Sequence, residues 1–193
     1  MIIVLEASAT NDLVMHGIVV AVASDAGHRF SKPVRDSITM IEGHGVEGDA
    51  HAGPFVRHRY LARRRPSLPN LRQVHVIRSE LFGELRALGY DVDPGDLGEN
   101  VTTSGLDLER LPLGTLLSLG ASAVIELTGL RTPCVLIDRY RAGLQSRMID
   151  AASTGPRFRC GVLGVVKADG LVVAGDNVAA TVPQKPWRLL PAL

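Results

Sequence analysis

The feature that most constrains the fold is a series of short apolar runs in the second half of the chain, separated by glycine-containing turns. Each run is rich in Val, Leu, Ala and Ile and is shorter than a typical helix; the runs are residues 116–119, 123–127, 162–166, 171–173 and 178–182. Short strands that follow one another at intervals of roughly 8–12 residues are typical of β-barrels and β-sandwiches. The pattern therefore predicts a mainly β protein.

The first half of the chain adds three predicted strands. Residues 17–23 are rich in β-branched side chains and predict a strand that is buried on both faces, while residues 33–41 and 72–77 alternate as shorter strands. Between them, residues 42–70 are rich in Gly, His, Arg and Pro and have no regular periodicity. A segment of this length without periodicity is usually a functional or a disordered loop.

One helix is clear and a second is weaker. In residues 79–89 the apolar side chains fall on one helical face, Ser79 is a candidate N-cap and Gly89 ends the helix; the apolar side chains are Leu81, Phe82, Leu85 and Leu88. Residues 139–149, with Leu144 and Met148, predict a second helix. We therefore expect a β-barrel with one or two attached helices.

Length and composition fit one folded domain with short extensions. The chain has 193 residues, 46% of them hydrophobic and 21% charged, so it can bury a substantial core and is not disordered as a whole. We expect the domain to span residues 16–182. Residues 1–15 would be a leader strand, and residues 183–193 a surface tail with Trp187 as its anchor.

Charge and cysteine content exclude several classes of protein. The net charge of +1 gives no bulk attraction to nucleic acid or to an anionic membrane, and no apolar run approaches the roughly 20 residues that span a bilayer. The first ten residues lack the basic region of a secretory signal, and two cysteines cannot form a disulfide framework. We expect a cytoplasmic protein with free thiols that binds neither nucleic acid nor membranes.

Two loops in the first half are candidate binding elements. Residues 45–53 contain closely spaced glycines around Asp49 and His51, which suits either a ligand-binding turn or an ordinary surface turn. Residues 57–65 contain five arginines, Arg59 among them. Such a run is usually a solvated face, but arginine also suits phosphate or a pterin diphosphate. The histidines nearby lack zinc-site spacing, so a protein-bound zinc ion is not favoured.

The turn at residues 93–101 is a third candidate. It begins with Pro94-Gly95, a strong turn signal, and ends with Glu99 and Asn100 at the start of a predicted strand. Polar side chains at a junction between a loop and a strand can contact the edge of a ligand. The alternative is ordinary turn chemistry.

The sharpest feature is the cysteine at position 134. A predicted strand ends near Gly129, and Arg131-Thr132-Pro133 then delivers Cys134 on a turn that the proline constrains. A nearby arginine favours the thiolate, which is the form that acts as nucleophile and metal ligand. A lone cysteine is more often an inert buried residue, but this setting favours function. Cys160 has no such setting and is interpreted as structural.

In this order, the motifs resemble the MOSC domain, named for the C-terminal domain of molybdenum cofactor sulfurase. The matching segments are residues 48–51, 70–75, 98–101, 113–115, 119–120, 126–134, 161–166 and 175–176, so the resemblance spans about residues 16–180. Glycine-Asp turns alone would be weak support, but the ordered set that ends in Arg-x-Pro-Cys is specific. The sequence is most similar to the small stand-alone bacterial, YiiM-like branch of the family.

The resemblance implies a β-barrel with a pocket for the pterin-based molybdenum cofactor. Carried over by position, Cys134 would be the catalytic residue that binds molybdenum or carries sulfur. The cofactor-binding residues would be Asp49, His51, Gly98, Glu99, Asn100 and Arg131, with Arg59 and Arg147 as less certain anion contacts. Nothing is transferred to Cys160.

Two functions associated with the family stay open at this point. The first is reduction of small N-hydroxylated compounds with Cys134 as molybdenum ligand, supplied with electrons by a partner protein. The second is a sulfur carrier that holds a persulfide on Cys134 for cofactor or metal–sulfur cluster maturation. In that case a pyridoxal-phosphate-dependent desulfurase is the partner. We expect no pyridoxal phosphate and no iron–sulfur cluster in this chain, since it lacks a motif lysine and four-cysteine spacing.

Overall fold

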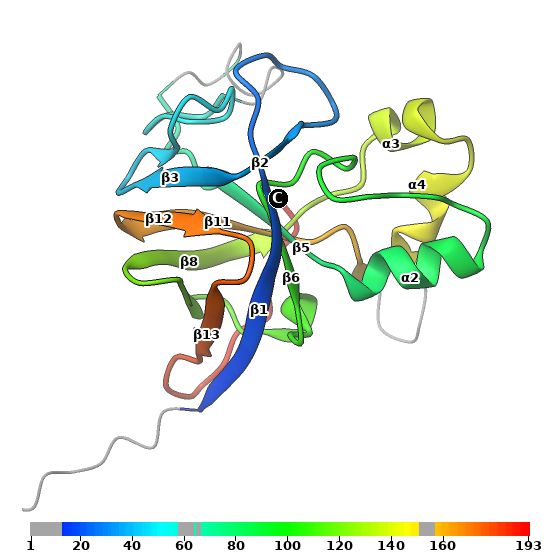
Figure 1. The fold of residues 1–193 in the computed structure, drawn as a ribbon. Coiled ribbons are helices and arrows are strands. Elements are labelled where there is room, and N and C mark those ends of the chain that lie inside the picture. Colours follow the sequence, from blue (N-terminus) through cyan, green and yellow to red (C-terminus); the bar gives the residue numbers. More distant parts are fainter. Residues whose placement is uncertain (1–12, 58–63, 65–66, 151–156) are drawn as a thin grey trace, which may run out of the picture.

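The protein folds around a closed β-barrel (Figure 1). The computed structural model describes residues 13–57, 64, 67–150 and 157–193. Seven of the described strands form the barrel: β1 (Val14–Ala23), β5 (Val74–Arg78), β6 (Val101–Ser104), β7 (Leu116–Leu119), β8 (Ala123–Leu130), β11 (Val162–Ala168) and β13 (Asn177–Thr181). Their order is β13-β7-β8-β11-β5-β6-β1, and β1 closes the ring by pairing with β13. The predicted β-barrel is confirmed.

Smaller strands surround the barrel. β2 (Val34–Arg35) extends the sheet beside the end of β1. A three-stranded sheet has the order β12-β3-β4, formed by Gly170–Val173, Ser37–Ile41 and Gly45–Val46, and β9 (Ile149–Asp150) pairs with β10 (Arg157–Phe158). The loop predicted for residues 42–70 therefore begins with the short strand β4, and its residues 58–63 and 65–66 lie outside the described residues.

The barrel interior holds the main core. Along β8 every second residue is buried, because successive side chains of a strand point to opposite faces. Ile125 and Leu127 of β8 pack in one cluster with Leu117, Val162 and Val178 from neighbouring strands. Truncating one such side chain to alanine costs about 2–5 kcal/mol of stability.

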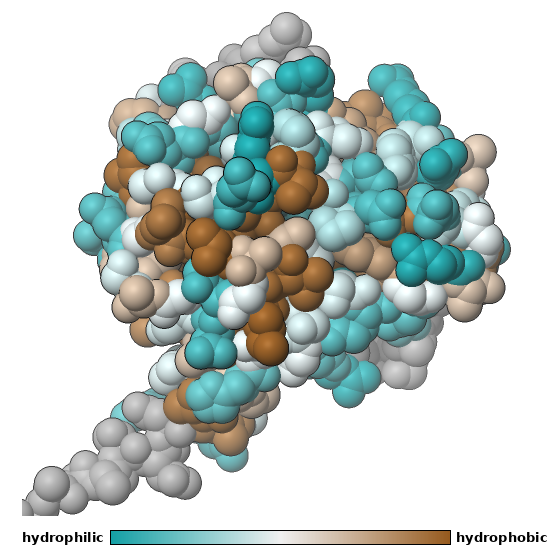
Figure 2. Space-filling view, in the orientation of Figure 1, coloured by the Kyte–Doolittle hydropathy of each residue, from teal (hydrophilic) through white to brown (hydrophobic). Residues whose placement is uncertain are grey.

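The strand β1 differs from its prediction because only its last three residues, Ala21–Ala23, are buried on both faces. Ile18 and Val20 are exposed, and so is Val34 on the neighbouring β2. Figure 2 shows hydrophobic residues gathered on this face of the molecule. A β-branched run alone does not tell which face of a barrel strand is covered, since the outer face depends on what packs against it.

The described α-helices lie on one side of the barrel around a second apolar cluster (Figure 1). Helix α2 (Glu80–Ala87) buries Leu81, Phe82 and Leu85, as predicted. Leu88 is 55% exposed, and Ser79 makes no side-chain cap, so those two details of the prediction are wrong. None of the described helices is long and apolar enough to cross a membrane.

The second predicted helix is in fact two short helices. These are α3 (Val135–Tyr140) and α4 (Leu144–Arg147), and the prediction of one helix over residues 139–149 is wrong. The break falls at Gly143, whose φ of 80° is left-handed and places it before the first turn of α4. Leu144 and Met148 are buried, as an amphipathic pattern requires, but the same pattern does not show where the backbone turns.

The two ends of the predicted domain also differ from expectation. β1 begins at Val14, and Met15 pairs with Ala180 in the barrel. In the tail, Trp187 is 47% exposed, whereas Leu190 is 6% exposed and packs in the barrel core. The expected role of Trp187 as the anchor is therefore wrong, and Leu190 has that role.

Candidate functional site

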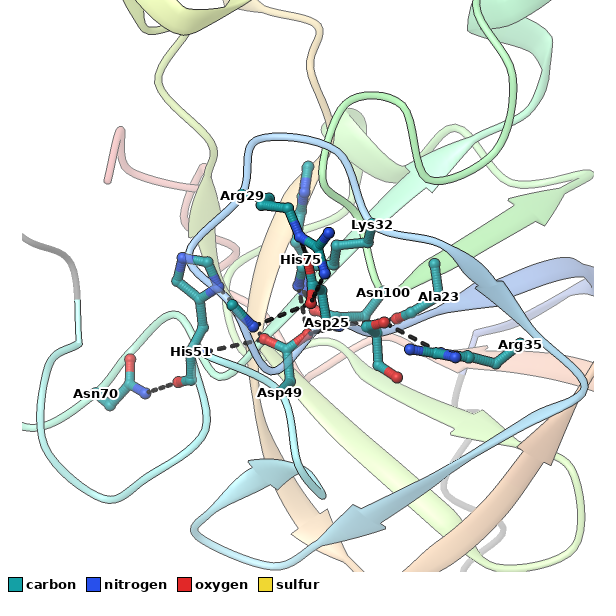
Figure 3. A network of polar contacts seen from close by, with 12 residues as sticks. Ala23, Asp25, Arg29, Lys32, Arg35, Asp49, His51, Asn70, His75 and Asn100 are labelled. Carbon is teal, nitrogen blue, oxygen red and sulfur yellow. Dashed lines mark hydrogen bonds and ion pairs between the residues drawn. The ribbon is translucent and has the colours of Figure 1, made fainter.

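A cavity of about 310 Å³ lies where several loops meet at one end of the barrel. Its walls come from residues 28–32, 51–57, 70–75, 98–100 and 131–136, which are far apart in the sequence. Figure 3 shows polar side chains of this region, among them Lys32, Asp49 and Asn100, pointing toward one another. The cavity joins four of the sequence segments that were singled out above: the glycine loop, the Asn70–His75 segment, the Gly98–Asn100 turn and the cysteine turn.

Cys134 lines this cavity at the start of α3. Its backbone is extended, its carbonyl accepts a hydrogen bond from the N–H of Ile137, and Pro133 precedes it. The thiol is half-buried, and Leu136 on the first turn of the helix also lines the cavity. The strand end, the proline and the helix therefore fix the cysteine at the wall of the pocket.

Cationic side chains dominate the cavity wall. Lys32, Arg29, Arg57, Arg72 and Arg131 all line it. Arg29 pairs with Asp25, and Lys32 pairs with Asp49. Among the described residues, the guanidinium of Arg72 forms no ion pair or hydrogen bond. Nη1 of Arg131 is buried and has no hydrogen-bond partner among the same residues. Burial and the charge of Arg131 lower the pKa of Arg72. Two neighbouring guanidinium groups that form no ion pair within the described residues favour an anionic ligand.

A buried polar network supports this wall (Figure 3). The Oδ2 atom of Asp49 lies 2.8 Å from Nζ of Lys32 and accepts a hydrogen bond of 3.0 Å from Nδ2 of Asn100. The backbone N–H of His51 donates to Oδ1 of Asp49 at 2.9 Å. Burial opposes the charge of Asp49, but the hydrogen bonds from His51 and the charge of Lys32 together lower its pKa below the usual range. The aspartate is therefore ionised and holds three segments together.

His75 is a site residue to which the sequence analysis gave no role of its own. It is buried on β5, and its Nε2 atom lies 2.8 Å from the carbonyl oxygen of Cys160. Burial and the charge of Arg131 lower its pKa well below the usual range. The ring is therefore neutral and donates Nε2–H to that carbonyl. The sequence feature that could have pointed to His75 is its place in the Asn70–His75 segment.

Lys32 was also missed. The sequence gives it only as one of three lysines, and no motif surrounds it. Its Nζ reaches the aspartate of the glycine loop only because the loop before β2 crosses the cavity. Burial lowers the pKa of Lys32, and the charge of Asp49 opposes that shift. The rarity of lysine in an arginine-rich chain was the one available signal.

The predicted site residues fall into three groups. His51, Gly98, Asn100, Arg131 and Cys134 line the cavity, and Asp49 lies directly behind the wall. Glu99 does not line the cavity; it accepts hydrogen bonds from the Gly95 N–H and the Thr102 hydroxyl, and its burial raises its pKa. Arg147 is exposed on α4 and does not line the cavity. Arg59 lies outside the described residues.

Cys160 has a different environment from Cys134. It is fully buried, its thiol donates a hydrogen bond of 3.0 Å to the carbonyl of Arg131, and burial raises its pKa to about 12. This agrees with its interpretation as a structural residue. Within the described residues, no group of three His, Cys, Asp or Glu side chains is placed to hold a metal ion.

Comparison with known proteins identifies the fold and the family. The structure of YuaD from Bacillus subtilis has 23% sequence identity and a TM-score of 0.73, and the match covers 90% of this chain and 100% of that chain. YiiM from Escherichia coli has 20% identity and a TM-score of 0.61 over 91% of this chain and 73% of its own. YiiM from Geobacillus stearothermophilus has 17% identity and a TM-score of 0.54 over 87% of this chain and 73% of its own.

No curated protein matches the chain. The model of the MOSC domain matches residues 49–179, which contain the second part of the glycine loop (residues 49–53), the cysteine turn and most of the barrel. This family is generally associated with binding of the molybdenum cofactor. The match covers more than half of the sequence, and on that ground the chain belongs to the MOSC domain family.

Proposed function

We propose that the protein binds the molybdenum cofactor in the cavity, with Cys134 as a metal ligand, and reduces small N-hydroxylated compounds. The observation that carries the proposal is the position of Cys134 in the same cavity as Arg72 and Arg131, which form no ion pair with any acidic side chain in the part of the chain that the structure describes. The Arg147 and Glu99 side chains have no part in it, because neither lines the cavity.

The residues of the cavity fit a phosphate-bearing cofactor with a soft metal. Guanidinium groups form forked, charge-assisted hydrogen bonds with phosphate oxygens, and Arg72 and Arg131 are available for this. A cysteine thiolate is a soft ligand of the kind that such metals take. A cofactor that carries its own metal needs few protein ligands, which suits a wall with a single cysteine.

The side chains would divide the work as follows. Arg72 and Arg131 hold the anionic end of the cofactor, and Cys134 holds the metal. Lys32, Asp49 and Asn100 keep the wall rigid through their buried contacts. When bound, the cofactor supplies two-electron transfer. The N–O bond of the substrate takes up two electrons and two protons, and an amine-type N–H and water are formed. A separate electron-donor protein supplies the electrons.

A second candidate is the sulfur carrier. Cys134 is half-buried rather than enclosed, and the apolar residues after it, Val135 and Leu136, are exposed. A thiol in this position is reachable for a partner desulfurase, which would transfer sulfane sulfur to the thiolate and leave a persulfide on Cys134. This observation favours the carrier, whereas the cationic wall behind the thiol favours the cofactor.

The test is metal, pterin and sulfur analysis of protein purified from a host that makes the cofactor. The parent protein should carry molybdenum and pterin in near-equal amounts, and Cys134→Ser should lose the metal and the reduction of an N-hydroxylated base. Cys160→Ser is the matched control and should keep both. A persulfide on Cys134 without molybdenum or pterin would refute the reductase and support the carrier. A Cys134→Ser protein with full metal, activity and sulfur acceptance would refute both.

A further inference from the structure

The C-terminal segment of the chain runs along the end of β8, next to the turn that carries Cys134. β7 pairs with β8 only between Ala123 and Glu126, so β7 does not cover the last residues of β8. There the tail takes its place. The N–H of Leu130 donates to the carbonyl of Pro191 at 2.7 Å, and the N–H of Leu193 donates to the carbonyl of Leu130 at 2.9 Å. The tail thus adds a short parallel pairing where β7 ends.

The same segment continues to the cysteine turn. The backbone N–H of Thr132 donates to the main-chain oxygen of Leu193 at 3.0 Å, and the Thr132 hydroxyl donates to the same oxygen. On the other side, the N–H of Arg131 donates to the carbonyl of Gly161 at 3.0 Å. Arg131 and Thr132, which both line the cavity, are therefore held from two sides just before Pro133 and Cys134.

The packing of the tail shows that this contact is built into the sequence. Leu190 is 6% exposed and belongs to the barrel core, which anchors the segment. Gly129 lies where the tail crosses β8, and a Cβ atom there would stand 2.5 Å from Cγ of Leu193 and 2.7 Å from the carbonyl oxygen of Pro191. A glycine inside a strand often marks such a close approach of backbone.

We propose that residues 190–193 are a positioning segment for the cysteine turn. They fix Thr132 and, through it, the places of Arg131 and Cys134 in the cavity wall. This inference rests on the proposed function, because the segment positions residues of the same cavity. Its test uses anion binding and thiol chemistry, so it can fail or succeed without molybdenum.

The test compares two proline substitutions that differ by one position. Leu193→Pro removes the N–H that binds Leu130, whereas Ala192→Pro changes an exposed residue whose N–H has no hydrogen bond within the described residues. Leu193→Ala separates the loss of the side chain from the loss of the N–H. The readout is the alkylation rate of Cys134 by the neutral reagent iodoacetamide, measured at rising concentrations of sulfate as an anion probe.

Sulfate protection is measured as the sulfate concentration that halves the alkylation rate of Cys134. We expect Leu193→Pro to raise this concentration by about threefold to tenfold, which corresponds to the free energy of one hydrogen bond. Ala192→Pro should match the parent protein. Should Leu193→Pro fail to fold, Thr132→Val is the second variant, with Thr132→Ser as the rescue that keeps the hydroxyl. Parent-like protection in both Leu193→Pro and Thr132→Val would overturn the inference.

The outcome also separates the two proposals. If sulfate does not protect Cys134 in the parent protein, the anion site of the proposed function fails. The positioning role is then judged from the alkylation rate without sulfate. Leu193→Pro should raise this rate and Ala192→Pro should not, and equal rates in the two variants would refute the positioning role.

Discussion

The two cysteines of this protein both lie near Arg131 and have opposite surroundings. Cys134 is half-buried in the wall of a cationic cavity, whereas Cys160 is enclosed and donates its thiol hydrogen to the carbonyl of Arg131. The residue type is the same, so its chemistry is decided by the water, charge and cavity around it. Of the two thiols, the accessible one lies where loops form a cavity beside the barrel.

The largest expected effect is a difference in reactivity between the two thiols. With a pKa of about 12, roughly one Cys160 thiol in ten thousand is ionised at pH 8, against about a quarter of ordinary thiols. We expect iodoacetamide to label Cys134 on the order of a hundredfold faster or more in native protein. Mass mapping after brief labelling measures this ratio. Faster labelling of Cys160 than of Cys134 would show that the expected difference between the two thiols is wrong.

The next effect concerns the network that supports the cavity. Asp49→Asn leaves Lys32 buried without its anionic partner, and breaking a buried ion pair in this way typically costs about 3–5 kcal/mol. Denaturant unfolding of the variant and the parent protein at pH 7 measures the difference. A loss below about 1 kcal/mol, the range of exposed ion pairs, would show that the pair does not hold the wall.

The same variant has a predicted pH dependence. The folded-state pKa of Asp49 lies below its unfolded value of about 4, so ionised Asp49 stabilises the fold above that pH. This contribution is lost as the pH falls through and below about 4. The stability of Asp49→Asn should therefore fall less between about pH 5 and pH 2 than that of the parent protein. If the stability of the two proteins changed equally with pH, the assignment of a lowered pKa to Asp49 would be wrong.

The smallest expected effect is a loss of anion binding without a loss of thermal stability. Arg72→Ala should weaken sulfate or pyrophosphate binding by about tenfold to hundredfold, since one charge-assisted hydrogen bond is lost. Its melting temperature should not fall, because no described acidic group pairs with this half-buried guanidinium. Arg147→Ala, on an exposed arginine outside the cavity, is the control. Equal anion affinity in the two variants would mean that Arg72 does not contact the anion.

Much of the barrel was predictable from local pattern. The strand predicted for residues 116–119 coincides with β7. The predicted strands that begin at residues 123, 162 and 178 start within one residue of β8, β11 and β13. Alternation and short apolar runs suffice here, because a closed barrel buries one face of each strand. The second helix failed because its periodicity does not reveal the left-handed Gly143 that divides it.

The cavity was predictable in part. The glycine loop and the cysteine turn carry recognisable motifs, and the structure brings His51 and Cys134 to one cavity. Glu99 lies in the same turn as Asn100, yet only Asn100 lines the cavity, whereas Glu99 is buried and accepts hydrogen bonds from Gly95 and Thr102. Lys32 carried no motif, and its role follows from a loop that crosses the cavity.

The sequence by itself determined most of the barrel strands, the proline-constrained turn that carries Cys134, and the glycines where the backbone comes close. These follow from local stereochemistry, which acts between neighbours in the chain. Only the tertiary structure decided which charges remain unpaired and which thiol is enclosed. It also decided that Leu190, not Trp187, anchors the tail. Burial and pairing depend on residues that lie far apart in the sequence, and the closure of the barrel is what brings them into contact.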